Sequence, residues 1–347
     1  MAPKYRGGSD DFIDDQSGRS SRKASSKKPQ ERPAAEALPD EQANATVVEV
    51  FHKQCRVALD AADSTTQEVL CSYRRAAVLD HGKEDGKDLR ERSPVTVGDR
   101  VQVELTGSQT GVVLGMCRRT NQLYRQAPGR DLGNVHVIAA NLDALVIVAS
   151  VDAPLFSPGL IDRYLIAAQA ARISPILCVT KSDLLKTSDQ DPPWKIYQEI
   201  EVPVFEVCSK TGVGVDPLRD SLINQRVAFC GHSGVGKTSL LRALLGADVG
   251  KVGEVSEVTG KGRHTTTSSV LFSGPSAAKW IDTPGIRGFG LMDIKPEELF
   301  RFYAEFRDLD CRSPGCLHLE EDGCEAHGLV RYETYRRIHQ SLVEGES

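Results

Sequence analysis

The sequence lacks a long hydrophobic run. Its longest uninterrupted apolar stretch, Ala144–Ala149, is far shorter than the roughly 18 residues that a membrane-spanning helix needs. No apolar segment follows the basic residues near the N-terminus either, so we expect no secretory signal. Together these absences argue against membrane-embedded and secreted classes and favour a cytoplasmic protein.

The chain also lacks an excess of positive charge and a disulfide framework. Its 43 basic and 48 acidic residues give a formal net charge of −5, so any contact with nucleic acid must come from a local basic patch. Nine cysteines, an odd number, are scattered over 347 residues, unlike the dense pattern of a small secreted protein. At about 150 residues per domain, this length predicts two or three domains.

Residues 1–43 have the composition of a disordered tail. They mix Gly, Ser, Pro and charges of both signs, and they carry too little apolar surface to offset the entropy of ordering. The basic cluster Arg19–Lys28 leaves open a second interpretation, an arm that contacts RNA.

Residues 44–137 show short β runs separated by turn residues. The expected strands are Val47–Val50, Cys55–Leu59, Ala76–Leu79, Arg100–Leu105 and Gly111–Leu114. Such a series predicts a small closed barrel of the oligonucleotide-binding (OB) type, an RNA-binding fold. The arginines of this region either form a solvated face or contact phosphate, and both interpretations stay open. They are Arg74, Arg75, Arg90, Arg92, Arg118, Arg119, Arg125 and Arg130.

Residues 138–293 alternate predicted strands with predicted helices. The expected strands include Ala144–Val148, Pro175–Val179, Val202–Val207 and Arg226–Cys230. Ser157 and Pro158 offer a cap and a first-turn proline to the helix that follows the first of these strands. This alternation predicts an α/β domain with a mostly parallel sheet. Residues 294–347 are expected to be helical on both sides of a cysteine-rich segment, on faces formed by Leu299, Phe302, Tyr303, Phe306, Tyr332, Tyr335, Ile338 and Leu342.

A phosphate-binding loop follows the strand Arg226–Cys230. The segment fits G-x-x-x-x-G-K-[ST] at every fixed position and opens an apolar helical run. Its expected nucleotide-binding residues are Gly231, His232, Ser233, Gly234, Val235, Gly236, Lys237, Thr238 and Ser239. Lys237 would neutralise the β- and γ-phosphates, and the Thr238 hydroxyl would bind Mg²⁺.

Two segments predict that the nucleotide is a guanine nucleotide. Thr180, Lys181, Ser182 and Asp183 follow a predicted strand, and Ser209 and Lys210 follow the next one. The Asp183 carboxylate would accept hydrogen bonds from N1–H and the 2-amino group of guanine. Adenine offers neither donor, a mismatch of about 1–3 kcal/mol. The alternative is an ordinary polar turn.

Residues that hold Mg²⁺ and sense the γ-phosphate are expected after the phosphate loop. Asp282 ends a predicted strand and is placed to hold Mg²⁺, and Gly285 would let the backbone approach the γ-phosphate. Either Thr266 or Thr267 would complete the metal shell. The base-recognition segments precede the phosphate loop, whereas in ordinary GTPases they follow it, so this α/β P-loop GTPase domain is predicted to be circularly permuted.

Three thiolates and one imidazole lie close together in the C-terminal region. Cys311, Cys316, His318 and Cys324 predict one closed, structural Zn²⁺ site in a helical zinc-binding domain. Free buried cysteines, or a disulfide plus one thiol, are the alternatives, and His327 is a substitute ligand. The isolated cysteines are expected to fill strands and cores. They are Cys55, Cys71, Cys117, Cys178, Cys208 and Cys230.

The chain contains, in this order, the barrel, the base-recognition segment, the phosphate loop, His264–Thr267, Asp282–Gly285 and the Cys/Cys/His/Cys cluster. This arrangement resembles the ribosome small subunit-dependent GTPase A family. The resemblance covers roughly residues 44–343. It implies a monomeric GTPase that binds the small ribosomal subunit late in maturation. It also implies that the barrel and the zinc domain contact rRNA and that the subunit stimulates hydrolysis.

Two positions bear on how water would be oriented for hydrolysis. Ile286 stands where many GTPases have a water-orienting Gln, which implies slow intrinsic turnover. Asp293 stands near the place where some family members carry a His, and His264 is another candidate. Two other functions stay open: a permuted GTPase with a non-ribosomal partner, and an RNA-binding module with a vestigial nucleotide pocket.

Overall fold

The computed structural model describes residues 37–60, 67–73, 94–126, 135–185, 191–246, 269–283, 290–291, 294–311 and 315–344. All of them fall in the contact unit Ala34–Ser347. The expected tail therefore lies almost wholly outside the described residues. Within the described part of the chain, no helix has the length and apolar character that crossing a bilayer requires.

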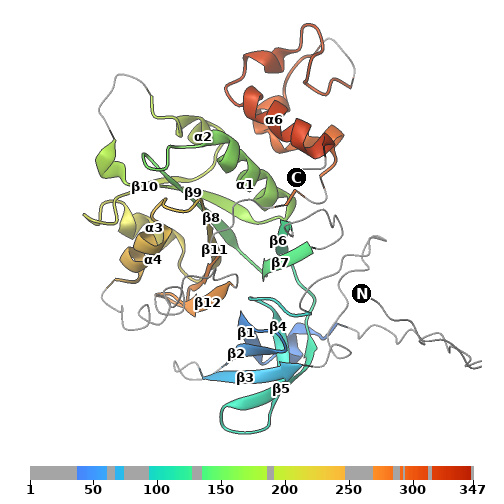
Figure 1. Ribbon diagram of the computed structural model, residues 1–347, viewed down its shortest axis with the longest axis vertical. Coiled ribbons are helices and arrows are strands. Elements are labelled where there is room, and N and C mark those ends of the chain that lie inside the picture. The colour runs from blue at the N-terminus through green and yellow to red at the C-terminus, as the bar shows by residue number, and fades with distance from the viewer. Residues whose placement is uncertain are drawn as a thin grey trace, which may run out of the picture. The chain divides into compact units, whose positions relative to one another are not determined.

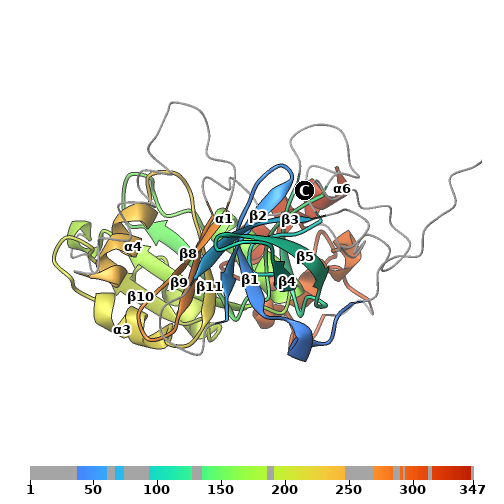
Figure 2. The same ribbon diagram turned by 90° about the horizontal axis from the view of Figure 1, so that it is seen from below.

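The N-terminal part folds into a closed barrel (Figures 1 and 2). Its strands are β1 Ala45–Val50, β2 Gln54–Leu59, β3 Glu68–Tyr73, β4 Arg100–Leu105 and β5 Thr110–Met116. They pair in the order β1-β2-β3-β5-β4, and β4 pairs again with β1, which closes the ring. The third strand was not identified from the sequence, and the expected strand Ala76–Leu79 lies outside the described residues.

Small apolar side chains fill the barrel because its strands alternate between inward and outward positions. In β2, Cys55 and Val57 are buried whereas Gln54 and Arg56 are exposed. A two-stranded ribbon, β6 Gln122–Gln126 and β7 Val135–Ala140, follows the barrel in the chain.

A parallel sheet forms the middle of the chain. It contains β8 Ala144–Ser150, β9 Ser174–Thr180, β10 Val204–Val207, β11 Arg226–Cys230, β12 Val270–Ser273 and β13 Lys279–Asp282. Their order is β10-β9-β8-β11-β13-β12, and only β12 runs antiparallel to its neighbour within this set. Strand β12 also pairs with β1 at Val270 and Glu49, so the barrel continues the same ladder.

Helices cover both faces of this sheet (Figure 1). They are α1 Pro158–Ala170, α2 Lys195–Glu199, α3 Val215–Ser221 and α4 Lys237–Leu245. Strand β8 is buried along its whole length because its alternate side chains enter two cores. Leu145 and Ile147 pack in the core that includes α1 and α2, and Val146 and Val148 pack in the core that includes α3 and α4. Pro158 begins α1 as expected, but the Ser157 side chain makes no capping hydrogen bond.

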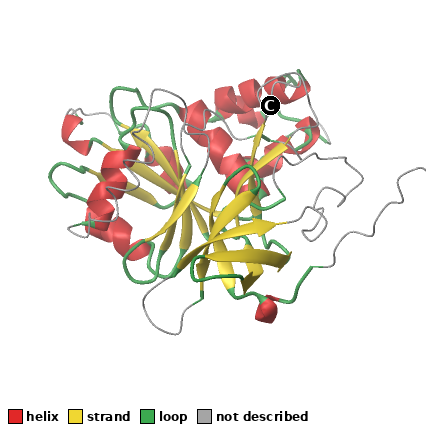
Figure 3. Cartoon of the chain, turned by 60° about the horizontal axis from the view of Figure 1, so that its bottom comes forward, coloured by secondary structure: helices red, strands yellow, loops and turns green. Residues whose placement is uncertain are grey.

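The C-terminal segment, residues 294–344, contains helices and loops but no strand among its described residues (Figure 3). The first expected helix is 3₁₀ rather than α, in two pieces, η6 Pro296–Phe302 and η7 Ala304–Phe306. A further 3₁₀ turn, η8 Glu325–Gly328, leads to α6 Tyr332–Val343. Their buried side chains join the same core as α1, so this segment has no separate core among the described residues.

A buried ion pair ties α6 to α1. Arg331 Nε donates to Asp162 Oδ1 at 2.9 Å, and the two side chains are 2% and 0% exposed. The same guanidinium donates to Glu305 at 3.0 Å and lies over the ring of Tyr303, and the Thr334 hydroxyl donates to Asp162. Burial raises the pKa of Asp162 and Arg331 opposes that shift, so each charge depends on the other.

We expect Asp162→Ala to lower the free energy of unfolding by about 3–5 kcal/mol, because it leaves the buried Arg331 charge with Glu305 as its only carboxylate partner among the described residues. The double variant Asp162→Ala with Arg331→Met removes both charges and should cost less than the sum of the two single changes, Asp162→Ala and Arg331→Met. Chemical denaturation of all the variants measures both values. Additive losses would contradict a coupled pair.

Candidate nucleotide-binding site and metal centre

The phosphate loop lies between β11 and α4. Gly231 has φ +153°, and a Cβ added there would lie 2.3 Å from the Val148 carbonyl oxygen of β8. Gly236, with φ +93°, is the N-cap of α4, and no side chain caps this helix. The loop therefore requires glycine where it passes β8, and the first N–H groups of α4 remain available to bind an anion.

Lys237 and Asp282 meet beside this loop. Lys237 Nζ donates to the Thr283 carbonyl oxygen at 2.6 Å and lies 3.3 Å from Asp282 Oδ1. That oxygen is buried and accepts no hydrogen bond from a described residue. The Thr283 hydroxyl donates to the Phe229 carbonyl of β11, which holds the end of β13 next to the phosphate loop. Thr238 and Ser239 are exposed at the start of α4.

The donor set of Asp282 and Thr238 fits a divalent cation. A buried carboxylate oxygen without a hydrogen-bond donor needs a positive charge nearby. Among the described residues, Lys237 is the one that supplies a positive charge to Asp282 Oδ1. Carboxylate and hydroxyl oxygens are the ligands that Mg²⁺ accepts in nucleotide sites.

The segment after β9 is tied to the phosphate loop. The Thr180 hydroxyl contacts the carbonyls of Ala149 and Val235. Lys181 has φ +58°, and its Nζ donates to the Gly234 carbonyl at 3.0 Å and to the Asp152 carbonyl at 3.2 Å. This contact joins the segment after β9 to the phosphate loop.

The segment after β10 lies against Asp183. Lys210 Nζ is 3.9 Å from Asp183 Oδ2, and the Cys208 thiol donates to Oδ1 at 3.3 Å. Strands β9 and β10 are parallel with Thr180 opposite Val207, so the residues that follow them are neighbours. The structure thus brings together the two segments that the sequence placed 26 positions apart, from Asp183 to Ser209.

Two contributors to this site belong to no motif in the sequence. One is the loop after β8, whose carbonyls at Asp152 and Ala153 accept from Lys181. The other is Cys208, which was assigned to core packing. The position of each directly after a strand of the parallel sheet was the available indication. Five expected residues lie outside the described residues: His264, Thr266, Thr267, Gly285 and Asp293.

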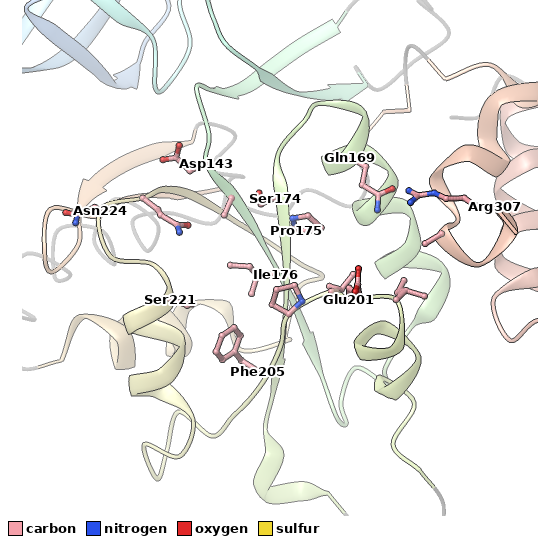
Figure 4. A pocket seen from close by; sticks show the side chains of 16 residues that line it. Asp143, Gln169, Ser174, Pro175, Ile176, Glu201, Phe205, Ser221, Asn224 and Arg307 are labelled. Atoms are coloured by element: carbon pink, nitrogen blue, oxygen red, sulfur yellow. The ribbon is translucent and has the colours of Figure 1, made fainter.

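A hollow of about 920 Å³ lies at the opposite end of the same sheet (Figure 4). Its lining includes Asp143, which directly precedes β8, and Ser174 and Pro175, which begin β9. Gln169 and Arg307 face each other across one side of the hollow. The phosphate loop follows the carboxyl ends of the strands, so this hollow is separate from the nucleotide site.

The four expected zinc ligands converge. The ligand atoms of Cys311, Cys316, His318 and Cys324 all lie within 4.8 Å of one another. Cys311 Sγ is 3.7 Å from Cys324 Sγ, and His318 Nδ1 is 3.4 Å from both sulfurs. Tetrahedral zinc would place such atoms about 3.6–3.8 Å apart. The cluster therefore fits one Zn²⁺ ion.

Neighbouring side chains hold the zinc loop in shape. The Glu321 carboxylate accepts from the N–H groups of Leu317 and Leu319, at 2.9 and 2.7 Å. The hydroxyls of Tyr332 and Tyr335 donate to the carbonyls of the same two residues. These four bonds are on the neighbours of His318, so they orient the ligand without competing for its ring.

The His318 ring also suits a metal ligand. It packs 5.2 Å from Phe306 and 5.7 Å from Phe300, measured between ring centroids. Burial lowers its pKa, which favours the neutral imidazole that metal binding requires. His327 is not part of the cluster, because its ring contacts the Leu319 carbonyl instead.

A family model and individual known proteins point to the same class of protein. The family model described as RsgA GTPase matches residues 116–292. The small ribosomal subunit biogenesis GTPase RsgA 2 of Bacteroides thetaiotaomicron is 36% identical over 273 residues, which cover 75% of this chain and 88% of that protein. The small ribosomal subunit biogenesis GTPase RsgA of Pseudomonas putida is 37% identical over 272 residues, covering 74% and 78%.

Solved structures agree on the fold. YjeQ from Thermotoga maritima superposes with a TM-score of 0.61 at 26% identity, covering 87% of this chain and 98% of that one. YloQ, described as a circularly permuted GTPase, gives a TM-score of 0.61 at 24% identity, covering 87% and 96%. The fold and the site thus define a circularly permuted GTP hydrolase, as predicted. With this family model and these relatives, the chain belongs to the RsgA GTPase family.

We expect the purified protein to contain about one zinc per chain. Cys324→Ser should release the metal and lower the free energy of unfolding by about 3 kcal/mol or more, because metal binding supplies local folding energy. Elemental analysis and thermal unfolding measure the two effects. Cys117→Ser, at an isolated buried cysteine, is the matched control and should keep its zinc. Full zinc content in Cys324→Ser would contradict the assignment.

Proposed function

We propose that this protein binds the small ribosomal subunit and hydrolyses GTP to GDP and phosphate during a late step of subunit maturation. The nucleotide site built around Lys237 and Asp282, in a chain whose relatives carry the name small ribosomal subunit biogenesis GTPase, is the observation that supports the proposal. Such a protein would work in the cytoplasm, as a monomer.

In this proposal the phosphate loop binds the anion and Asp183 selects guanine. The N–H groups at the start of α4 face the phosphates, and Lys237 moves from the Thr283 carbonyl to the β- and γ-phosphate oxygens. Asp282 and Thr238 would hold Mg²⁺, which supplies charge neutralisation when bound. Thr266 or Thr267 completes that shell, and Gly285 approaches the γ-phosphate.

The exchange of partners at Lys237 suggests how hydrolysis is communicated. When Lys237 leaves Thr283, the segment Asp282–Gly285 loses a contact to the phosphate loop. That segment continues into the C-terminal zinc-binding segment. The nucleotide state is therefore transmitted along the chain to a part of the protein proposed to contact rRNA.

The barrel is the second proposed rRNA contact, and the two neighbouring arginines that follow β5 differ in their surroundings. Arg119 forms a bidentate pair with Asp99, Nε to Oδ1 at 2.7 Å, with side chains 3% and 0% exposed, so it is structural. Arg118 is exposed on the same segment. In this proposal Arg118 would contact rRNA phosphate, which the acidic net charge of the chain does not prevent.

We expect a low basal GTPase rate that small ribosomal subunits raise more than about tenfold, because a bound partner supplies groups that orient water and offset charge. Release of phosphate with and without purified small subunits measures this. Lys237→Ala should be inactive in both conditions. Equal rates with and without subunits would contradict the proposal. It would also be contradicted if the protein did not co-sediment with small subunits in the presence of a non-hydrolysable GTP analogue.

We expect Asp183→Asn to reverse the base preference from GTP to XTP. The amide nitrogen of Asn would donate to the 2-carbonyl of xanthine, whereas it opposes the 2-amino group of guanine. The change in the ratio of the two dissociation constants should be roughly tenfold to a hundredfold. Equilibrium binding of both nucleotides is the measurement, and an unchanged ratio would remove Asp183 from base recognition.

A further inference from the structure

A second cleft, of about 440 Å³, lies between the barrel and the amino ends of β11 and β13. It shares Asp143 and Asn224 with the hollow of Figure 4. Among the described residues that line it, Ala277 is the one with an apolar side chain. The charged members of the lining are Arg100, Arg118, Arg226, Lys279, Asp40 and Asp143. A polar cleft in which cations outnumber carboxylates suits an anion rather than an apolar ligand.

Arg226 lines this cleft without an ion-pair partner among the described residues. Its Nη1 donates to the backbone carbonyls of Asn141, at 3.0 Å, and Gly98, at 3.4 Å. Its Nε is buried and has no hydrogen-bond acceptor in the described part of the chain. The Asp143 carboxylate accepts from the Arg226 backbone N–H, at 2.7 Å, and not from the guanidinium. Burial lowers the pKa of Arg226, so its charge is held at a cost.

The edge of the Arg226 guanidinium that lacks an acceptor is the one that suits a phosphate. A guanidinium presents two parallel N–H groups, on Nε and Nη2, which match two oxygens of a phosphate. Both described hydrogen bonds of this side chain use Nη1 instead. Because an unsatisfied charged donor is costly, an anion that supplies the acceptor gains binding energy.

Further cations reach the same cleft from two other segments. Lys279 is opposite Arg226 in the register of β13 and β11, so neighbouring strands each contribute one cation. Arg118 is exposed and lines the cleft from the segment after β5. Arg100 differs, because both of its terminal nitrogens donate to Asp60, at 2.8 and 2.6 Å, and this carboxylate matches its charge.

We propose that this cleft is a second phosphate-binding site, in which Arg226 and Lys279 bind one phosphate group. It is separate from the nucleotide site, because Gly231 follows Arg226 by five residues, roughly 16 Å along an extended strand. A backbone phosphate of RNA and free inorganic phosphate share this chemistry. The RNA source rests on the proposed binding to the small ribosomal subunit, and the free-phosphate source does not.

Titration with inorganic phosphate tests the site directly. The protein is first saturated with Mg²⁺ and a non-hydrolysable GTP analogue, which fills the phosphate loop. We expect Lys279→Gln to raise the dissociation constant of phosphate about tenfold. Arg226→Lys keeps the charge but loses the two parallel N–H groups, so it should also weaken binding. Lys195→Gln, at an exposed cation of α2 outside the cleft, is the matched control and should bind phosphate as the unchanged protein does.

Binding to small ribosomal subunits at several salt concentrations distinguishes the two sources. If an RNA phosphate fills the cleft, Lys279→Gln weakens subunit binding and lowers the slope of log K against log salt concentration by about one. If free phosphate is the ligand, Lys279→Gln weakens phosphate binding alone.

The site is overturned if Lys279→Gln changes neither measurement, or if Lys195→Gln causes an equal loss. An unchanged protein that binds phosphate in the cleft but does not bind subunits contradicts the proposed function and leaves the phosphate site standing.

Discussion

The nucleotide site depends on the pairing of Lys237 with the end of β13. Asp282 Oδ1 is buried without a hydrogen-bond donor among the described residues, so its charge is tolerated only beside a cation, and Lys237 Nζ lies 3.3 Å away. In the proposed function, a nucleotide phosphate would compete for the same lysine. Asp282 would then need a replacement cation, and a divalent ion held by Thr238 would meet that need. One buried carboxylate would thus couple phosphate binding to metal binding.

The permuted order of the chain does not disturb this site, because sheet order rather than chain order assembles it. Strands β8, β9, β10, β11 and β13 are parallel, so the loops that follow them meet at one edge. The Lys181 contact with Gly234 joins residues 53 positions apart. Chain order instead decides what is connected to the site, and here the segment after Asp282 continues into the zinc-binding segment.

Sequence patterns within short segments predicted those features of the structure that a short segment determines by itself. Buried strands such as β11, the glycines of the phosphate loop and the spacing of the zinc ligands are features of short segments, and the structure contains each of them. The contacts of Asp162 with Arg331 and of Asp183 with Cys208 join side chains that are distant in sequence and leave no periodic trace. The 3₁₀ form of η6 was missed because its apolar spacing also fits an α-helix.

The same long-range contacts explain why the C-terminal segment, residues 294–344, depends on the GTPase domain. Its apolar residues share one core with α1, and Arg331 is neutralised by Asp162 of that helix. The zinc loop adds local order, since Glu321, Tyr332 and Tyr335 satisfy the backbone on either side of His318. Metal binding would therefore shape the loop, while the ion pair with α1 attaches it. In the proposed function, a signal that begins at Thr283 would reach a segment whose described part is already held by these contacts, and the nucleotide would change how that segment is connected to the site.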